Sequence, residues 1–313
     1  MSELRPFQFL ADISPIVSGP ELAERARHAE DLGYHGVVLP DHLIGQLSPT
    51  VALATVAAAT STLRLSAFVL NNDLRHPAVL AQDLASIAVL SGGRLDVAIG
   101  AGWNKPEYDA IGLDFDPIRV RQARLAESIT VLKGLFSGEP FSFAGEHYTI
   151  TEYAAKPVPQ QCPPFFIGGG GKRTLTLAGR EADVVGLAPR ITDSKLDAWS
   201  ITLAATREKI SWAREAAGDR ADRLEFNTYP SGWPVTVTDD LHGEVARVID
   251  ALAQRTGARL SEADVLDSPH LFIGSVDRLV EKVLQLREEL GIRSFLFGEV
   301  GDLEPVIARL SGQ

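Results

Sequence analysis

The stretch SGPELAERARHAEDLGYHGVVLPDH, residues 18–42, joins a helix pattern directly to a strand pattern. Ser18 opens the helix pattern, Pro20 falls in the first turn, and apolar residues recur at helical spacing until Gly33. A glycine at this point ends a helix because it adopts a left-handed backbone without steric cost. The following run, residues 36–39, is strand-like and apolar, as in a strand buried within a parallel sheet. The segment therefore predicts an α/β fold.

The same unit recurs along the chain, and REELGIRSFLF at residues 287–297 repeats the pattern of a helix that a glycine ends before a strand. Eight strand-like runs alternate with helical patterns and are centred near residues 8, 38, 67, 97, 166, 185, 226 and 296. This alternation predicts a single (β/α)8 TIM barrel over residues 1–313, with an open doubly wound sheet as the alternative. Two irregular stretches, about 137–164 and 231–275, are expected as insertions at the C-terminal mouth of the barrel.

Composition and charge exclude several classes of function. The formal net charge of −11 and the lack of basic clusters disfavour nucleic acid as a partner. No window of 18 apolar residues is present, and the N-terminus lacks a signal-peptide pattern, so we expect a cytoplasmic protein that does not cross a membrane. The single cysteine, Cys162, has no histidine near it in sequence and is interpreted as a bystander, with a nucleophile as the weaker alternative.

In a barrel, functional groups lie at the carboxyl ends of the strands, which directs attention to Asp41 and His42 after the second strand. A metal site is disfavoured because only His76 follows another strand and converging ligands are missing, so no metal is expected. A structural interpretation is that Asp41 caps the next segment and His42 is a satisfied core imidazole. The third interpretation is a polar pair at the edge of a bound cofactor.

Four consecutive glycines, Gly168, Gly169, Gly170 and Gly171, lie between a strand pattern and a helix pattern and are followed by Lys172 and Arg173. Glycine backbone and a helix N-terminus favour a bound anion such as phosphate, and a plain flexible turn is the alternative. We therefore expect that replacing Gly170 with Val weakens cofactor binding and leaves the fold intact.

A second glycine-lined strand end is GAGWNKPE, residues 100–107. Gly100 and Gly102 would let a flat ligand lie against the backbone, whereas the alternative is simply a tight exit from the strand. Trp103 fits a packing role as well as a stacking role.

Taken together, these segments resemble the bacterial luciferase-like superfamily, and in particular its branch of oxidoreductases that use the deazaflavin coenzyme F420. The resemblance spans nearly the whole chain and depends on the order and spacing of several segments rather than on one motif. Those segments are residues 29–42, 63–112, 143–150, 156–185 and 273–297.

The resemblance implies a barrel that holds an isoalloxazine-type ring across its C-terminal mouth, with Asp41 and His42 near the polar edge of the ring. It also implies a bulge in the third strand behind the ring, at Phe68 and Val69, with a cis peptide bond between them. The glycines at 168–171 would then hold the phosphate of the cofactor.

One position departs from the pattern of the sugar-phosphate dehydrogenases in this family, which carry a Glu directly after the Gly-x-Gly. Trp103 occupies that position here, which argues against glucose 6-phosphate as a substrate. Glu107 lies four residues further on and is a candidate catalytic residue, beside Asp41 and His42, with its role left open. His42 is the candidate proton donor.

The leading hypothesis is therefore an F420-dependent oxidoreductase acting on a small molecule. An FMN-dependent monooxygenase of the same superfamily is the first alternative, and a barrel that binds its cofactor or a partner without turnover is the second. A metal hydrolase is disfavoured by the missing ligand set. Aromatic residues in the expected insertions and strand ends predict an apolar, partly aromatic pocket; they are Trp103, Tyr108, Phe141, Tyr229 and Trp233.

The resemblance also implies a homodimer. The helical segment AVLAQDLASIAVL, residues 78–90, supports this weakly because it is apolar nearly all round, whereas a surface helix of a barrel needs only one apolar face. Burial of the excess under a neighbouring loop is the alternative.

Overall fold

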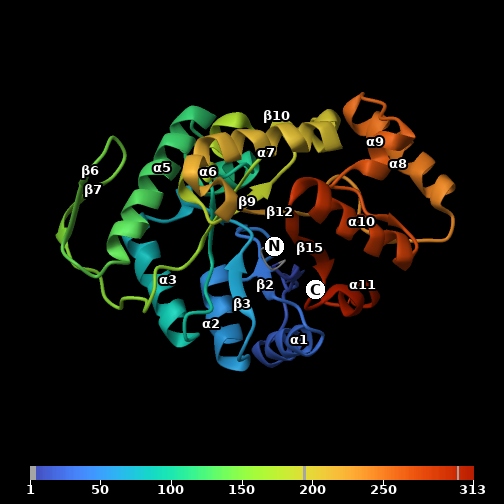
Figure 1. Cartoon of the computed structure of the whole chain (residues 1–313). Coiled ribbons are helices and arrows are strands. Elements are labelled where there is room, and N and C mark those ends of the chain that lie inside the picture. The colour runs from blue at the N-terminus through green and yellow to red at the C-terminus, as the bar shows by residue number, and fades with distance from the viewer. Residues whose placement is uncertain (1–4, 193–194, 302) are drawn as a thin grey trace. The chain divides into compact units, whose positions relative to one another are not determined.

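The computed structural model describes residues 5–192, 195–301 and 303–313, and within them strands and helices alternate as the sequence predicts (Figure 1). All eight expected strands are present. They are β1 (Gln8–Asp12), β2 (Gly36–Leu39), β3 (Arg64–Ala67), β5 (Val97–Gly100), β8 (Phe165–Gly169), β9 (Val184–Leu187), β12 (Glu225–Thr228) and β15 (Ile292–Glu299).

The helices that follow or flank these strands are α1 (Gly19–Asp31), α2 (Pro49–Ala59), α3 (Pro77–Leu90), α4 (Lys105–Ile111), α5 (Ile118–Leu135), α6 (Lys172–Glu181), α7 (Leu203–Ala217), α8 (Leu241–Thr256), α9 (Glu262–Asp267), α10 (Val276–Leu290) and α11 (Glu304–Leu310). Among the described residues, no helix combines the length and the apolar character needed to cross a membrane.

The order of the strands in the main sheet is β3-β2-β1-β15-β12-β9-β8-β5-β4, where β4 is Leu70–Asn71. Strands that follow one another in the chain are neighbours, and the last strand, β15, pairs in parallel with the first, β1. β3 and β4 stand at the two ends of this order, yet they are two halves of one segment that is interrupted at Phe68–Val69. This is the order of a (β/α)8 barrel and not of an open doubly wound sheet, in which the strand order reverses.

The helices form for local reasons that the sequence contains, and α10 is an example. The Ser275 side chain accepts a hydrogen bond from the Arg278 N–H at the start of the helix, and Gly291 (φ 72°) ends it in the left-handed region. The buried residues of α10 recur at spacings of three and four and so occupy one face; they are Leu279, Val283, Leu286 and Leu290.

The chain divides into two compact units. Unit 1 comprises Met1–Asp12, His28–Gly36 and Gly168–Gln313, and unit 2 comprises Ile13–Arg27 and Val37–Ile167. Within unit 1, β1, β15, β12 and β9 pair in parallel in that order. Stacked aromatic rings from β1 and β15 fill the core of this unit, with centroids 6.1 Å apart for Phe9 and Phe295 and 5.9 Å apart for Phe9 and Phe297.

Within unit 2, β4 pairs with β5 and β5 pairs with β8, again in parallel. The peptide bond between Phe68 and Val69, at the junction of β3 and β4, is cis, as the family resemblance implies. That a single domain covers the whole chain stays a prediction.

The two stretches expected to be irregular contain regular structure. In residues 137–164, β6 (Phe141–Ala144) and β7 (Thr149–Tyr153) form an antiparallel hairpin beside α5 (Figure 1). The Glu127 carboxylate of α5 accepts three backbone N–H groups at the hairpin tip, which fixes the hairpin to the helix. The stretch 231–275 contains α8 and α9, whose apolar faces form a cluster with Ala198 and Ile201. The expectation of an irregular segment is wrong there, because this stretch forms the two capped helices α8 and α9.

Two basic side chains, the half-buried Lys282 and the buried His270, contact the end of this α8–α9 insertion. Lys282 of α10 donates hydrogen bonds to the carbonyls of Leu266 and Leu271, and burial lowers the pKa of Lys282 to about 7. The fully buried His270 contacts the Tyr229 carbonyl through Nδ1 at 3.2 Å, while its Nε2 has no hydrogen-bond partner among the described residues. Burial, with Lys209 and Lys282 nearby, lowers the pKa of His270 to about 3. This imidazole is therefore neutral at physiological pH.

Candidate active site

His42, the second residue of the polar pair after β2, contacts the carboxylate of Glu107, which lies 65 residues further along the chain. His42 Nδ1 lies 2.9 Å from Oε1 and 3.1 Å from Oε2 of Glu107. The Glu107 side chain is 3% exposed and the His42 side chain is 26% exposed. The imidazole is therefore partly exposed while its Nδ1 contacts a buried acid, which is the base-and-orienter arrangement of many active sites.

Local structure explains how Glu107 reaches this position. It lies in the first turn of α4, where a carboxylate is favoured by the helix dipole, and Gly112 (φ 70°) ends the helix after two turns. The next residue, Tyr108, is fully buried, and its hydroxyl lies 3.0 Å from Asn71 Oδ1 and 3.1 Å from Asp73 Oδ2. This contact ties α4 to the segment after β4 and so fixes the Glu107 side chain.

Burial shifts the pKa values of Tyr108 and Asp73, the two ionisable groups in this contact. Burial raises the pKa of Tyr108 to about 12, and the neighbouring Asp73 raises it as well. Burial also raises the pKa of Asp73, against the lowering effect of Arg124, whose Nε lies 3.0 Å from Asp73 Oδ1. The Tyr108 hydroxyl therefore stays neutral and donates a hydrogen bond that holds α4 to the segment after β4.

The Asp41 carboxylate does not share the partner of His42 and instead accepts hydrogen bonds from Arg75 and Asn71. The Arg75 guanidinium donates to both Asp41 oxygens, at 2.6 Å and 3.0 Å, and the Asn71 N–H donates at 2.9 Å. The Asp41 side chain is 1% exposed, so its charge is fully committed to these contacts. Arg75 is a site residue that the sequence pattern does not single out. The available signal is its position in the segment after the third strand, four residues beyond Asn71.

Trp103 packs edge-on against His42, with ring centroids 5.6 Å apart and planes at 90°, and remains 55% exposed. Of the aromatic residues expected to line a pocket, Trp103 lies beside His42, and its role as a lining residue stays a prediction. Tyr108 is wrong as a lining residue because it is fully buried, and Trp233 packs into the α8–α9 cluster with its Nε1 on Glu244. Phe141 packs against Gly134 of α5.

The glycines of the GAGW segment serve the packing of the protein itself. A Cβ at Gly100 would lie 2.8 Å from Val69 Cγ2. Gly102 has φ +72°, and a Cβ there would lie 2.0 Å from the Tyr108 hydroxyl. The structure therefore favours the tight strand exit, and no ligand is needed to explain either glycine.

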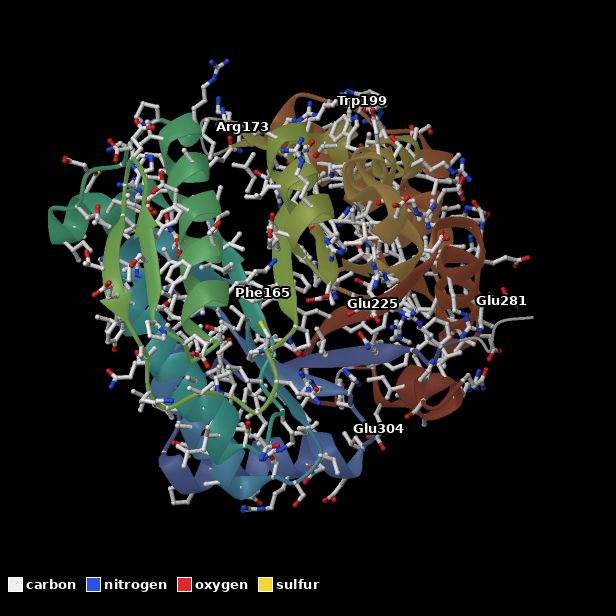
Figure 2. All side chains as sticks on the ribbon, turned by 60° about the vertical axis from the view of Figure 1, so that its left-hand side comes forward. Phe165, Arg173, Trp199, Glu225, Glu281 and Glu304 are labelled. Carbon is white, nitrogen blue, oxygen red and sulfur yellow. The ribbon has the colours of Figure 1, made fainter. Side chains whose placement is uncertain are left out.

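In unit 1, the tetraglycine lies at the end of β8 and the start of α6, as expected. A Cβ at Gly169 would meet the Thr174 side chain at 2.6 Å, and one at Gly170 would meet the Pro189 carbonyl oxygen at 2.2 Å. Gly171, the N-cap residue of α6, has no atom within 4 Å of such a Cβ. Lys172 and Arg173 are both exposed at this helix N-terminus. Figure 2 labels Arg173 there. The backbone is thus open to a ligand at Gly171 rather than at Gly170.

The Gly170→Val substitution is therefore expected to destabilise the protein, by about 3 kcal/mol, because its side chain would overlap fixed backbone. The expectation that it leaves the fold intact is wrong. Urea denaturation of Gly170→Val and of Gly171→Ala measures this, since the second variant adds its methyl group to open space and should unfold like the wild type. Equal stability of the two variants would contradict the packing argument.

Comparison with known proteins supports the assignment of a family. The family model described as luciferase-like monooxygenase matches residues 5–294. The F420-dependent hydroxymycolic acid dehydrogenase of Mycobacterium tuberculosis is 34% identical over 184 residues, which cover 56% of this chain and 51% of that protein. The F420-dependent glucose-6-phosphate dehydrogenase of Nakamurella multipartita is 33% identical over 233 residues, covering 70% and 66% of the two chains.

The chain thus spans about half to two thirds of the length of these curated relatives. Among solved structures, the coenzyme F420-dependent tetrahydromethanopterin reductase of Methanopyrus kandleri superposes with a TM-score of 0.75 and 19% identity, covering 98% of both chains. That likeness shows the barrel fold alone. Because the family model matches nearly the whole chain, this protein belongs to the luciferase-like monooxygenase family.

Proposed function

We propose that this protein is an F420-dependent oxidoreductase that transfers a hydride between the deazaflavin and a small organic substrate. The observation that carries the proposal is the His42–Glu107 pair, a partly exposed imidazole whose Nδ1 lies 2.9 Å from a buried carboxylate at the carboxyl ends of two strands. The F420-dependent relatives support the choice of cofactor.

The residues at the junction of β3 and β4 fit a bound ring. Phe68 and Val69 are half-buried, whereas the residues on either side of them are buried. The Phe68 N–H donates to the Leu39 carbonyl at 2.8 Å, which keeps this segment beside the strand that leads to His42. Phe68, Val69 and His42 of unit 2 would therefore contact the ring. For unit 1, the family resemblance supports a phosphate held by the open backbone at Gly171, with Lys172 and Arg173 beside it.

The proton chemistry belongs to His42. When bound, F420 supplies a two-electron hydride carrier, and a proton must move at the substrate for charge to balance. Nδ1–H of His42 donates to the Glu107 carboxylate, so Nε2 is the atom left to give a proton to the substrate or take one from it. The buried Glu107 fixes the tautomer and orientation of the ring and stabilises the imidazolium form.

Asp41, which the sequence suggests as a catalytic residue, is proposed to act by positioning. Both of its oxygens accept hydrogen bonds from Arg75, so it holds the backbone before His42 and the segment after β4 together. This leaves proton transfer to the neighbouring imidazole.

Cofactor titration tests the proposal. Absorbance and fluorescence titrations are expected to give saturable binding of F420, with FMN bound more weakly. Gly171→Asp places a carboxylate at the N-terminus of α6 and should weaken F420 binding about tenfold or more, because it opposes the phosphate and occupies its site. Gly171→Asn is the matched comparison, because it has the size of Asp without the charge, and it should weaken F420 binding less than Gly171→Asp does.

Tight binding of FMN with no binding of F420 would contradict the proposal and favour an FMN-dependent monooxygenase. F420 binding with no oxidation or reduction of any alcohol or carbonyl substrate would favour a cofactor-binding barrel without turnover. The cytoplasmic location stays a prediction.

A homodimer is also proposed, through α2 and α3, which pack on each other. Val51 of α2 and Val79, Val89 and Leu90 of α3 are between 49% and 68% exposed, so the excess apolar surface of residues 78–90 is not covered within the chain. Light scattering is expected to give a mass near twice 33.7 kDa. Leu90→Asp should shift the mass to that of one chain, and an unshifted dimer would exclude this face as the interface.

A further inference from the structure

Asn71, the last residue of β4, contacts the sequence neighbours of both members of the His42–Glu107 pair. Its backbone N–H donates to Asp41 Oδ2 at 2.9 Å, and Asp41 directly precedes His42. Its side-chain Oδ1 lies 3.0 Å from the hydroxyl of Tyr108, which directly follows Glu107. One residue therefore connects the segment after β2 with α4.

The contact between Asn71 and Asp41 is firmly held. Asp41 Oδ2 accepts from the Asn71 N–H and from Arg75 at 2.6 Å, and the Asp41 side chain is 1% exposed. A buried carboxylate that gave up these charge-assisted hydrogen bonds would lose them without compensation from water. The backbone that leads into His42 is therefore held to the end of β4.

The contact between Asn71 and Tyr108 is enclosed by the end of β5. Asn71 is 8% exposed and Tyr108 is fully buried, so water does not compete for their hydrogen bond. A Cβ at Gly102 would lie 2.6 Å from Asn71 Oδ1 and 2.0 Å from the Tyr108 hydroxyl oxygen, so the bond passes directly beside the Gly102 backbone. The Gly102 carbonyl accepts from Arg121, which fixes the chain at this point.

These two contacts control the separation of His42 and Glu107. Nδ1 of His42 lies 2.9 Å from Glu107 Oε1, which is a hydrogen-bond distance. The partner of Nδ1 determines which ring nitrogen carries the proton in the neutral imidazole. A displacement of about 1 Å in a reacting group can cost about a hundredfold in rate, so the alignment of this pair matters for proton transfer.

We propose that Asn71 is a positioning residue that aligns His42 with Glu107 and thereby sets the tautomer of the imidazole. The inference rests on the proposed function, in which Nε2 of His42 exchanges the proton. Asn71 exchanges no proton itself, because an amide does not titrate, and it acts through Asp41 and Tyr108. Loss of its side-chain contact releases α4, so that Glu107 no longer holds the proton on Nδ1.

The 15N NMR signals of the imidazole nitrogens test this inference on the protein alone, without cofactor or substrate. The neutral His42 ring of the wild type is expected as the Nδ1–H tautomer, because Glu107 accepts that proton. In Asn71→Ser the ratio of the Nδ1–H to the Nε2–H tautomer should fall about tenfold, as expected for the loss of a hydrogen bond to a charged group. His42→Gln identifies the signals, because they are absent from its spectrum.

Serine is chosen because Asn71 has a second, structural contact. It caps the short helix η1 (Asn72–Leu74), where its Oδ1 accepts the Asp73 N–H at 3.1 Å. Serine caps helices about as well as asparagine does, but its shorter side chain does not reach Tyr108. The substitution therefore removes the proposed positioning contact and keeps the cap.

Asp197→Ser is the matched control. Asp197 caps the similar short helix η2 (Ala198–Ile201), and its side chain accepts the Trp199 N–H, also at 3.1 Å. The control makes the same change of cap at a position without a contact to the segment after β2 or to α4 in unit 2, so it should leave the His42 signals unchanged.

Tyr108→Phe removes the same hydrogen bond from its other side and tests the inference independently, even where Asn71→Ser does not fold. It should also lower the ratio of the Nδ1–H to the Nε2–H tautomer about tenfold. Adding Asn71→Ser to Tyr108→Phe should cause no further change, because both substitutions remove one interaction.

A wild-type ratio of tautomers in both Asn71→Ser and Tyr108→Phe would overturn the inference. So would a wild-type His42 ring that lacks the Nδ1–H tautomer, or a change in Asp197→Ser as large as that in Asn71→Ser. These outcomes are separate from failure of the proposed function, which appears as the absence of F420 binding in the cofactor titration.

Discussion

The His42→Ala variant is expected to lose about 10²–10⁴-fold in turnover, which is much more than it loses in affinity for F420. The reason is geometric. Nδ1 of His42 lies 2.9 Å from Glu107 and the ring is partly exposed, so the imidazole can exchange a proton with a substrate through Nε2. Alanine removes that proton path but leaves the β3–β4 junction and the tetraglycine segment unchanged.

Single-turnover kinetics of F420 oxidation or reduction, with binding measured separately by fluorescence, checks this prediction. Glu107→Gln is expected to lower turnover less than His42→Ala, because the amide oxygen can still accept from Nδ1–H while the charge that stabilises the imidazolium is lost. Asp109→Asn, on the exposed face of the same helix, is the matched control and should turn over like the wild type. Wild-type turnover of His42→Ala would return His42 to a packing role.

Acid is expected to destabilise this protein through His270, by at most about 5 kcal/mol between pH 6.5 and pH 3. The pKa of His270 is lowered from 6.5 to about 3 in the folded protein, so the unfolded chain binds one more proton in this window. Stability therefore rises with pH between the two values, and the contribution is fully present above pH 6.5. It is lost as the pH falls through the folded pKa.

The groups around His270 explain the shift and suggest the control. Its Nδ1 faces the Tyr229 carbonyl and the hydroxyls of Thr228 and Ser231, and Lys209 and Lys282 repel a second positive charge. Asparagine can donate to the same carbonyl but does not titrate. Urea denaturation of His270→Asn between pH 4 and 7 should thus show a flatter dependence on pH than the wild type. Parallel slopes for the two proteins would refute the role of His270.

Much of the fold was accessible from the sequence because it is encoded locally. A capping residue, an apolar face and a terminal glycine define α8 and α10 locally, through Asp240 and Gly257 and through Ser275 and Gly291. The apolar runs between helices define the eight strands. The barrel follows from the alternation of these units, since parallel strands joined by helices must lie side by side. The expectation of an irregular segment at 231–275 is wrong, because α8 and α9 bury an apolar cluster with residues 198–201 and Ile273 that forms only in the tertiary structure.

The sequence by itself determined the strand order and placed Asp41 and His42 at the end of β2, because strands and their ends have recognisable local patterns. The family and the cis bond at Phe68–Val69 followed from the resemblance of several segments to a known family. Only the tertiary structure decided which groups meet there. Glu107 binds His42 and Arg75 binds Asp41 because α4 and the segment after β4 fold against the end of β2. Such pairings depend on side-chain contacts between segments tens of residues apart, and no periodicity in the sequence records them.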